Sequence, residues 1–167
     1  MRSITQEGLD LICRFEGFSA KSYICPAGYP TIGYGHVVKD NEKAGFAGGI
    51  TKDEAMKLLR QDVNIAEQGV LRFISVVLSN NQFSALVSFT YNLGTGALQR
   101  STLRQKVNRE EHSEVPAEFE KWVLGGGKRL PGLIKRRHAE AVMYATPDSG
   151  MKVVESTTDS AELLGIY

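Results

Sequence analysis

The feature that most constrains the fold is a change of pattern at residue 17, where a helical periodicity ends and a segment rich in glycine and proline begins. Seven of the 17 glycines and two of the 5 prolines fall between residues 17 and 50, among short runs of β-forming residues. Such runs, bounded by turn residues, are typical of short strands. We therefore expect a small sheet over residues 17–50, with a type I turn at Cys25–Gly28 and alternating faces along Thr31–Val37.

Helical periodicity flanks the expected sheet on both sides. Thr5 can cap a first helix that runs to about Glu16. Thr51 and Glu54 form a capping box that opens a long helix through about Leu71. Further helices are expected at residues 80–92, 101–108, 115–124 and 131–145, with glycines between several of them.

These elements predict an α+β fold with two lobes. The small sheet lobe covers about residues 17–50, and the helical lobe covers about residues 72–146 together with the N-terminal helix. A cleft between the lobes is the expected place for a ligand. The polar, acidic stretch 147–167 is expected to be loosely ordered.

Composition and motifs exclude several classes of protein. With 42% apolar and 23% charged residues, the 167-residue chain can bury the core of one domain. No run approaches 18 consecutive apolar residues, so membrane insertion is not expected. The first residues lack the apolar run of a signal peptide, which indicates synthesis in the cytoplasm. Two cysteines and three histidines without metal-ligand spacing predict neither a disulfide framework nor a metal, and no cofactor is expected.

Basic residues are unevenly distributed although the formal net charge is only +1. Residues 80–144 hold 10 Lys+Arg against 6 Asp+Glu, and the density is highest between Lys128 and Arg137. Two interpretations fit this cluster. It is either a solvated helix face or a surface that attracts an anionic polymer.

Glu16 is the first candidate for chemistry. It ends an apolar helix face, where burial favours a protonated carboxyl group over a charged one. A carboxylic acid that keeps its proton near neutrality can donate it to a leaving oxygen atom. A helix-end glutamate paired with an arginine is the structural alternative.

A larger pattern surrounds Glu16. The matching segments are Phe15–Phe18, Tyr23–Gly28, Thr31–His36, Gly49–Ala55, Gln61–Val63, Phe89–Gly94 and Leu130–Leu133, followed by Arg136 and Arg137. Together they cover about residues 5–145 and resemble the phage lysozyme family, the endolysins and muramidases of glycoside hydrolase family 24.

The resemblance implies a glycosidase that cleaves the β-1,4 bond between N-acetylmuramic acid and N-acetylglucosamine in bacterial peptidoglycan. It implies one two-lobed catalytic domain over residues 1–146, in which the helix at 51–71 joins the lobes. We further expect a monomer, made in the host cytoplasm, that needs a holin to cross the inner membrane and reach the peptidoglycan of the periplasm and cell wall. Binding to nucleic acid is not expected.

The resemblance also assigns roles to individual residues. Glu16 would be the general acid and Thr31 would hold the attacking water. His36 would pair with Asp62, and either Arg136 or Arg137 would hydrogen-bond the region of Glu16. Four further positions match residues that contact the sugar chain: Gly35, Val37, Tyr91 and Asn92.

Cys25 departs from the commonest pattern of the family, which has an aspartate nine residues after the glutamate. The substitution removes the second carboxylate expected of a glycosidase. A polarisable thiol with an ordinary pKa of about 8.5 takes its place. Cys13, on the first helix, is expected to be incidental.

Two other function classes would use parts of the same pattern. Cys25 and His36 could form a nucleophile–base pair for amide hydrolysis, as in cell-wall peptidases and amidases. A non-catalytic wall-binding or nucleic-acid-binding module would rest on the basic cluster from Lys128 to Arg137. The second alternative leaves Glu16 and Thr31 unexplained.

Overall fold

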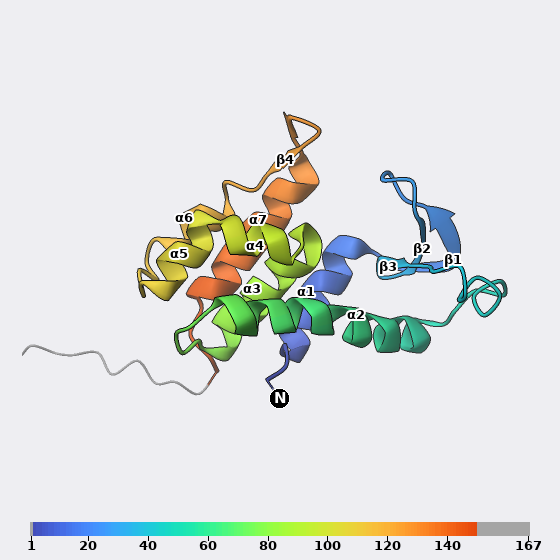
Figure 1. The fold of residues 1–167 in the computed structure, drawn as a ribbon, viewed down its shortest axis with the longest axis horizontal. Coiled ribbons are helices and arrows are strands. Elements are labelled where there is room, and N and C mark those ends of the chain that lie inside the picture. The colour runs from blue at the N-terminus through green and yellow to red at the C-terminus, as the bar shows by residue number, and fades with distance from the viewer. Residues whose placement is uncertain (1, 150–167) are drawn as a thin grey trace, which may run out of the picture.

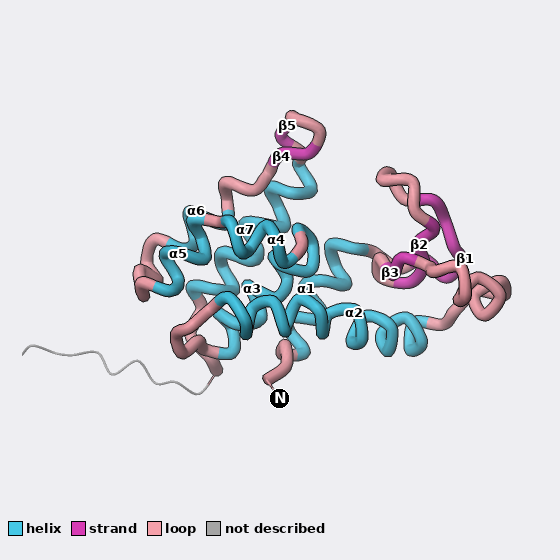
Figure 2. Tube along the Cα trace, viewed as in Figure 1, coloured by secondary structure: helices cyan, strands magenta, loops and turns pink. Residues whose placement is uncertain are grey.

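A computed structural model describes residues 2–149; Met1 and residues 150–167 lie outside the described part. Its elements are α1 (Gln6–Glu16), β1 (Ser19–Ile24), β2 (Pro30–Gly33), β3 (His36–Val37), α2 (Lys52–Phe73), α3 (Asn80–Leu93), α4 (Thr95–Arg100), α5 (Thr102–Asn108), α6 (Val115–Phe119), β4 (Leu124–Gly125), β5 (Lys128–Arg129) and α7 (Pro131–Ala145). Figure 1 shows a small β lobe and a larger helical lobe, and Figure 2 shows that β1–β3 lie in the β lobe while the short strands β4 and β5 lie on the helical lobe. The expected two-lobed α+β architecture is confirmed.

The long helix α2 connects the lobes. The Thr51 hydroxyl oxygen accepts a hydrogen bond from the Glu54 N–H, and the Glu54 carboxylate accepts one from the Thr51 N–H, so the predicted capping box is present. At 22 residues, α2 is about 33 Å long, which is enough to reach from one lobe to the other. Figure 1 shows it running from the helical lobe to the sheet.

The β lobe is a three-stranded antiparallel sheet in the order β1-β2-β3. The expectation of one continuous alternating run over Thr31–Val37 is wrong, because the chain turns between β2 and β3. Gly33 and Gly35 take positive φ angles of 66° and 88°, which allow this turn. As a result Thr31 lies opposite Val37, and Ile32 lies opposite His36.

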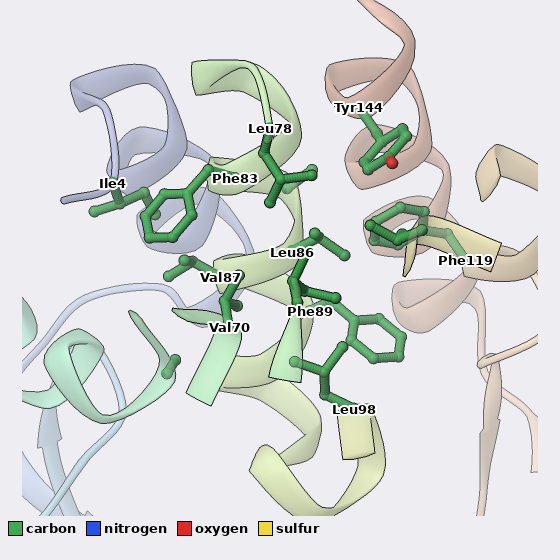
Figure 3. Close-up of a cluster of buried hydrophobic side chains, with 14 of the residues drawn as sticks. Ile4, Val70, Leu78, Phe83, Leu86, Val87, Phe89, Leu98, Phe119 and Tyr144 are labelled. Atoms are coloured by element: carbon green, nitrogen blue, oxygen red, sulfur yellow. The ribbon is translucent and has the colours of Figure 1, made fainter. Parts of the chain in front are cut away.

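The helical lobe is built around α3. Eight consecutive α3 residues, Phe83–Thr90, are buried, so this helix is surrounded on all sides. Figure 3 shows its side chains pointing toward the neighbouring helices, with Phe83 directed toward Ile4. Phe89 packs edge-on against Phe119 and Trp122 at ring distances of 5.6 and 5.4 Å.

The helical lobe also differs from the expected elements, at α4 and in the segment after α6. The six-residue helix α4 occupies a segment expected to be a glycine-containing linker, and it is too short to show a helical period. Helix α6 ends at Phe119 instead of about residue 124, and the chain then bends so that Trp122 reaches Phe89. The hairpin β4–β5 follows it.

The start of the expected loose tail is anchored. Asp148 accepts hydrogen bonds from the backbone N–H groups of Asn80 and Asn81 at 2.7 and 2.8 Å. The rest of the predicted tail, residues 150–167, lies outside the described residues. Within residues 2–149, no helix combines the length and apolar character needed to cross a membrane.

Candidate active site

Glu16 is the last residue of α1 and lies where the helical lobe gives way to the sheet. Its side chain keeps 21% of its surface exposed, and Oε1 accepts a hydrogen bond from Arg136 Nη1 at 2.6 Å. The carboxyl group at the end of the apolar helix face is therefore paired with an arginine, as the resemblance implied. Of the two arginines that the sequence left open, Arg136 makes this contact.

Gly35 and Tyr91 complete the surroundings of Glu16. A Cβ atom at Gly35 would lie 3.0 Å from Glu16 Oε2 and 3.6 Å from the Tyr91 hydroxyl, so the backbone here approaches both groups closely. Tyr91 donates a hydrogen bond to the Tyr34 carbonyl at 3.0 Å. Burial raises the pKa of Tyr91, so its phenol is neutral at physiological pH.

Cys25 and Thr31 lie together in the β lobe. The Cys25 N–H donates to the Tyr29 carbonyl at 2.9 Å, and the Gly28 N–H donates to the Cys25 carbonyl at 2.8 Å, which closes the predicted turn. Thr31 is buried, and its hydroxyl donates to the Tyr29 carbonyl at 3.0 Å. Hydrogen bonds with the Tyr29 backbone and the Thr31 hydroxyl lower the pKa of the Cys25 thiol.

Arg137 lies beside Arg136 but points to a different partner. It donates from Nη2 to Asn92 Oδ1 and from Nη1 to Glu140 Oε2, the latter at 2.5 Å. Asn92, one of the expected sugar contacts, is thus tied to α7. Arg136 and Arg137 are 3% and 0% exposed, so the basic cluster is not a single solvated face, although Lys128, Arg129 and Lys135 are exposed.

His36 makes the predicted contact with Asp62, at 2.7 Å from Nδ1 to Oδ2. Its other ring nitrogen lies 3.2 Å from Glu42 Oε2. Hydrogen bonding to the Lys39 backbone, with His36 as a further partner, lowers the pKa of Glu42. With carboxylates at both ring nitrogens, His36 has no free nitrogen to act as the base for Cys25.

Val37, one of the expected sugar contacts, lies on β3 with 48% of its surface exposed. In residues 2–149 no hydrogen bond joins Glu16 to Cys25 or Thr31, so the acid and the thiol–hydroxyl pair form two separate groups. Both cysteines are free thiols, and burial raises the pKa of Cys13.

Sequence reasoning missed Glu140, Ser88 and Glu42. Glu140 follows Arg136 by four residues and Arg137 by three, the spacings at which helical side chains meet, so this contact could have been anticipated. Ser88 donates to Glu140 Oε1 at 2.7 Å across two helices, and no local pattern predicts that contact. Among the described residues, no group of three or more potential metal ligands was found.

A profile of the phage lysozyme family matches residues 13–140. The chain belongs to this family. It is 41% identical over 145 residues to an endolysin of Acyrthosiphon pisum secondary endosymbiont phage 1, covering 84% of this chain and 97% of that protein. It is 42% identical over 149 residues to an endolysin of Bacillus phage B103, covering 88% of this chain but 56% of the longer relative.

Solved structures of family members share the fold. The muramidase domain of SpmX from Asticaccaulis excentricus superposes with a TM-score of 0.77 at 31% identity, covering 88% of this chain and 100% of that one. A variant of P22 lysozyme superposes with a TM-score of 0.76 at 27% identity, covering 87% and 100%. Other relatives are SAR-endolysins, such as that of Bacteriophage PS119, which is 32% identical over 125 residues, covering 75% of this chain and 73% of that protein.

Proposed function

We propose that this family member is a glycosidase that cleaves the β-1,4 bond between N-acetylmuramic acid and N-acetylglucosamine in peptidoglycan, and that it acts as an endolysin. The observation that carries the proposal is the position of Glu16. Its carboxyl group lies between the two lobes, against the Gly35 backbone and the Arg136 guanidinium. The endolysins and the muramidase domain among its relatives support the same activity.

Glu16 would act as the general acid that protonates the leaving glycosidic oxygen. The exposed fifth of its side chain leaves the carboxyl group accessible to a substrate, while Arg136 fixes its orientation. Positioning of this kind limits the geometries that the carboxyl group can adopt and so favours proton transfer along one path.

Cys25 and Thr31 would hold and activate the attacking water in an inverting reaction. An inverting glycosidase needs a group on the face of the sugar opposite the acid, with room for a water molecule between. A lowered thiol pKa increases the thiolate fraction, and a thiolate can accept a hydrogen bond from water and stabilise positive charge on the sugar ring.

Gly35, Val37, Tyr91 and Asn92 would line the path of the glycan. The bare backbone at Gly35 leaves space beside the acid, and exposed Val37 offers an apolar surface to a sugar ring. The Arg137 hydrogen bond fixes the orientation of the Asn92 amide.

We also propose that the protein works as a monomer, and that it is made in the cytoplasm and reaches the wall through a holin.

Mass spectrometry of muropeptides released from purified peptidoglycan tests which bond is cut. A muramidase yields fragments with N-acetylmuramic acid at the reducing end and no new amino groups. Release of amino groups without reducing ends would overturn the proposal. NMR of the fresh product tests the stereochemistry, because inversion of a β-linked substrate gives the α-anomer and a Cys25 nucleophile would give the β-anomer.

The route to the wall needs a separate experiment. Expression in a Gram-negative host is expected to leave cells intact until chloroform permeabilises the inner membrane. Lysis without membrane damage would contradict the holin proposal.

Size-exclusion chromatography with light scattering measures the oligomeric state, for which we expect a monomer.

A further inference from the structure

Behind Glu16 lies a buried charge cluster made of Arg136, Arg137, Glu140 and Ser88. Glu140 is 0% exposed and Arg137 is 0% exposed, while Arg136 is 3% exposed. Buried ion pairs stabilise a fold only weakly, because desolvation offsets much of the attraction. A fully buried carboxylate between two arginines, one of which binds the proposed catalytic acid, therefore calls for a functional explanation.

The contacts of Glu140 are those that an ionised carboxylate makes. Oε1 accepts from Arg136 Nε at 3.1 Å and from the Ser88 hydroxyl at 2.7 Å, and Oε2 accepts from Arg137 Nη1 at 2.5 Å. Burial raises the pKa of Glu140, and the two guanidinium groups oppose that shift. Since Arg136 and Arg137 present only donors, an ionised carboxylate fits this geometry.

Arg136 is shared between two carboxyl groups. Its Nη1 donates to Glu16, its Nε donates to Glu140, and its Nη2 donates to the Ser88 carbonyl at 3.3 Å. Arg137, in contrast, has Glu140 as its ion-pair partner among the described residues, and its Nε is buried without a hydrogen-bond partner. Glu140 thus balances a second guanidinium that would otherwise act on the acid.

The net charge of the cluster shows why Glu140 affects the protonation of Glu16. Arg136, Arg137 and Glu140 together carry a charge of +1 next to Glu16. Without Glu140 that charge would be +2, and a larger positive charge favours the ionised form of a neighbouring carboxyl group. An ionised Glu16 cannot protonate the leaving oxygen.

We propose that Glu140 is a positioning residue for the general acid: it orients Arg136 and neutralises Arg137, so that Glu16 is held by one guanidinium without being forced into its ionised form. This inference rests on the proposed function of Glu16. Besides the arginines of α7, Tyr91 from α3 and Cys13 from α1 itself interact electrostatically with Glu16. Burial raises the pKa of the Tyr91 phenol and of the Cys13 thiol, so both are neutral near pH 7, and Glu140 is the anion that balances the arginines.

The test uses the full chain and measures how its kcat/KM for soluble peptidoglycan fragments depends on pH. A general acid must be protonated, so activity falls on the alkaline side as it ionises. For Glu140→Gln we expect the midpoint of that alkaline limb to move about one pH unit lower. Glu140→Asp keeps the negative charge, so the midpoint of its alkaline limb is expected to stay close to that of the wild type.

Two further variants keep the test decisive if Glu140→Gln folds poorly. Arg137→Met removes the cation and is expected to move the alkaline limb to higher pH. The double variant Arg137→Met/Glu140→Gln restores the original charge count and is expected to bring the limb back to the wild-type position. Glu118→Gln is the matched control, because Glu118 is also buried and pairs with a lysine, Lys121 at 2.6 Å, outside this cluster.

The outcomes separate the two proposals. If the wild type cleaves the glycan and none of these variants moves the limb relative to Glu118→Gln, the positioning role of Glu140 is wrong. If the wild type releases no reducing ends, the proposed function fails first. An NMR titration of the Glu16 side-chain carboxyl in the same variants then decides the role of Glu140 without substrate, since unchanged midpoints would overturn it.

Discussion

Arg136 Nη1 lies 2.6 Å from Glu16 Oε1, and the two residues are 120 positions apart in the chain. This contact ties the end of α1 to α7 at the place where the lobes meet. The chemistry proposed for Glu16 therefore depends on a helix that sequence order places at the opposite end of the domain.

The close approach at Gly35 is expected to be required for activity. In Gly35→Ala the new Cβ would lie 3.0 Å from Glu16 Oε2 at a φ of 88°. We predict at least a ~10-fold loss of peptidoglycan hydrolysis, together with a destabilisation of about 1–3 kcal/mol from backbone strain. Gly94→Ala is the matched control: its φ is 89°, but nothing lies within 4 Å of its Cβ position. Equal losses of activity in both variants would show that strain alone is responsible.

The two thiols are expected to react differently. Hydrogen bonding lowers the pKa of Cys25, whereas burial raises the pKa of Cys13, so Cys25 has the larger thiolate fraction near neutrality. Iodoacetamide is therefore predicted to alkylate Cys25 first and to stop hydrolysis, as followed by mass spectrometry and activity. Cys13→Ser should be nearly silent in activity and serves as the single-thiol background.

Substitution at Cys25 tests its role in the reaction. We predict that Cys25→Asp is active, because a carboxylate can also bind and activate water, and that Cys25→Ala is strongly impaired. Initial rates on purified peptidoglycan measure both. A fully active Cys25→Ala variant would remove Cys25 from the mechanism.

The contact between His36 and Asp62 is expected to stabilise the junction of sheet and long helix. A double-mutant cycle with His36→Asn and Asp62→Asn, measured by urea unfolding at about pH 5.5, should give a coupling of about 1–2 kcal/mol. His138 and Glu120 provide the control. Their side chains also form a pair, with 3.1 Å between His138 Nδ1 and Glu120 Oε1, but they are 69% and 54% exposed. For that exposed pair the coupling should stay below about 0.5 kcal/mol. Equal couplings would contradict a structural role for His36.

Asp148 is expected to make stability depend on pH. Hydrogen bonds from the Asn80 and Asn81 backbones lower its pKa in the folded protein. The stabilisation is therefore fully present above the unfolded pKa of about 3.9 and is lost as the pH falls through the lower folded value. Asp148→Asn should unfold at a lower temperature than wild type near neutrality, with a difference that shrinks below about pH 3. Asp40→Asn, at an exposed ion pair with Lys43, should change little.

Much of the architecture could be predicted because local signals determine it. The capping box at Thr51 and Glu54 specifies where α2 begins, and glycine-rich turns separate the strands. Helix α4 could not be predicted because six residues are too few to show a helical period. The end of α6 could not be predicted because it depends on contacts such as that of Trp122 with Phe89. The turn after Gly33 needs knowledge of backbone φ angles that an alternating pattern does not supply.

In the candidate site, too, local sequence signals predict some features, and others depend on how the helices pack. The spacing of Glu16, Cys25 and Thr31 is visible in the sequence, but the choice of Arg136 over Arg137 as the partner of Glu16 depends on how α7 is rotated against α1. Burial of both arginines was not foreseen, since a run of basic residues ordinarily faces solvent. The second contact of His36, with Glu42, comes from a loop whose path no periodicity predicts.

The measurement that tests the central claim most directly is the rate of reducing-end release from purified peptidoglycan by wild type and Glu16→Gln. Glutamine keeps the size of the side chain and can still accept the hydrogen bond from Arg136, but it cannot donate a proton as an acid does. We predict at least a ~100-fold lower rate with a folded structure of unchanged or higher stability. A folded Glu16→Gln protein that releases reducing ends at nearly the wild-type rate would contradict the account.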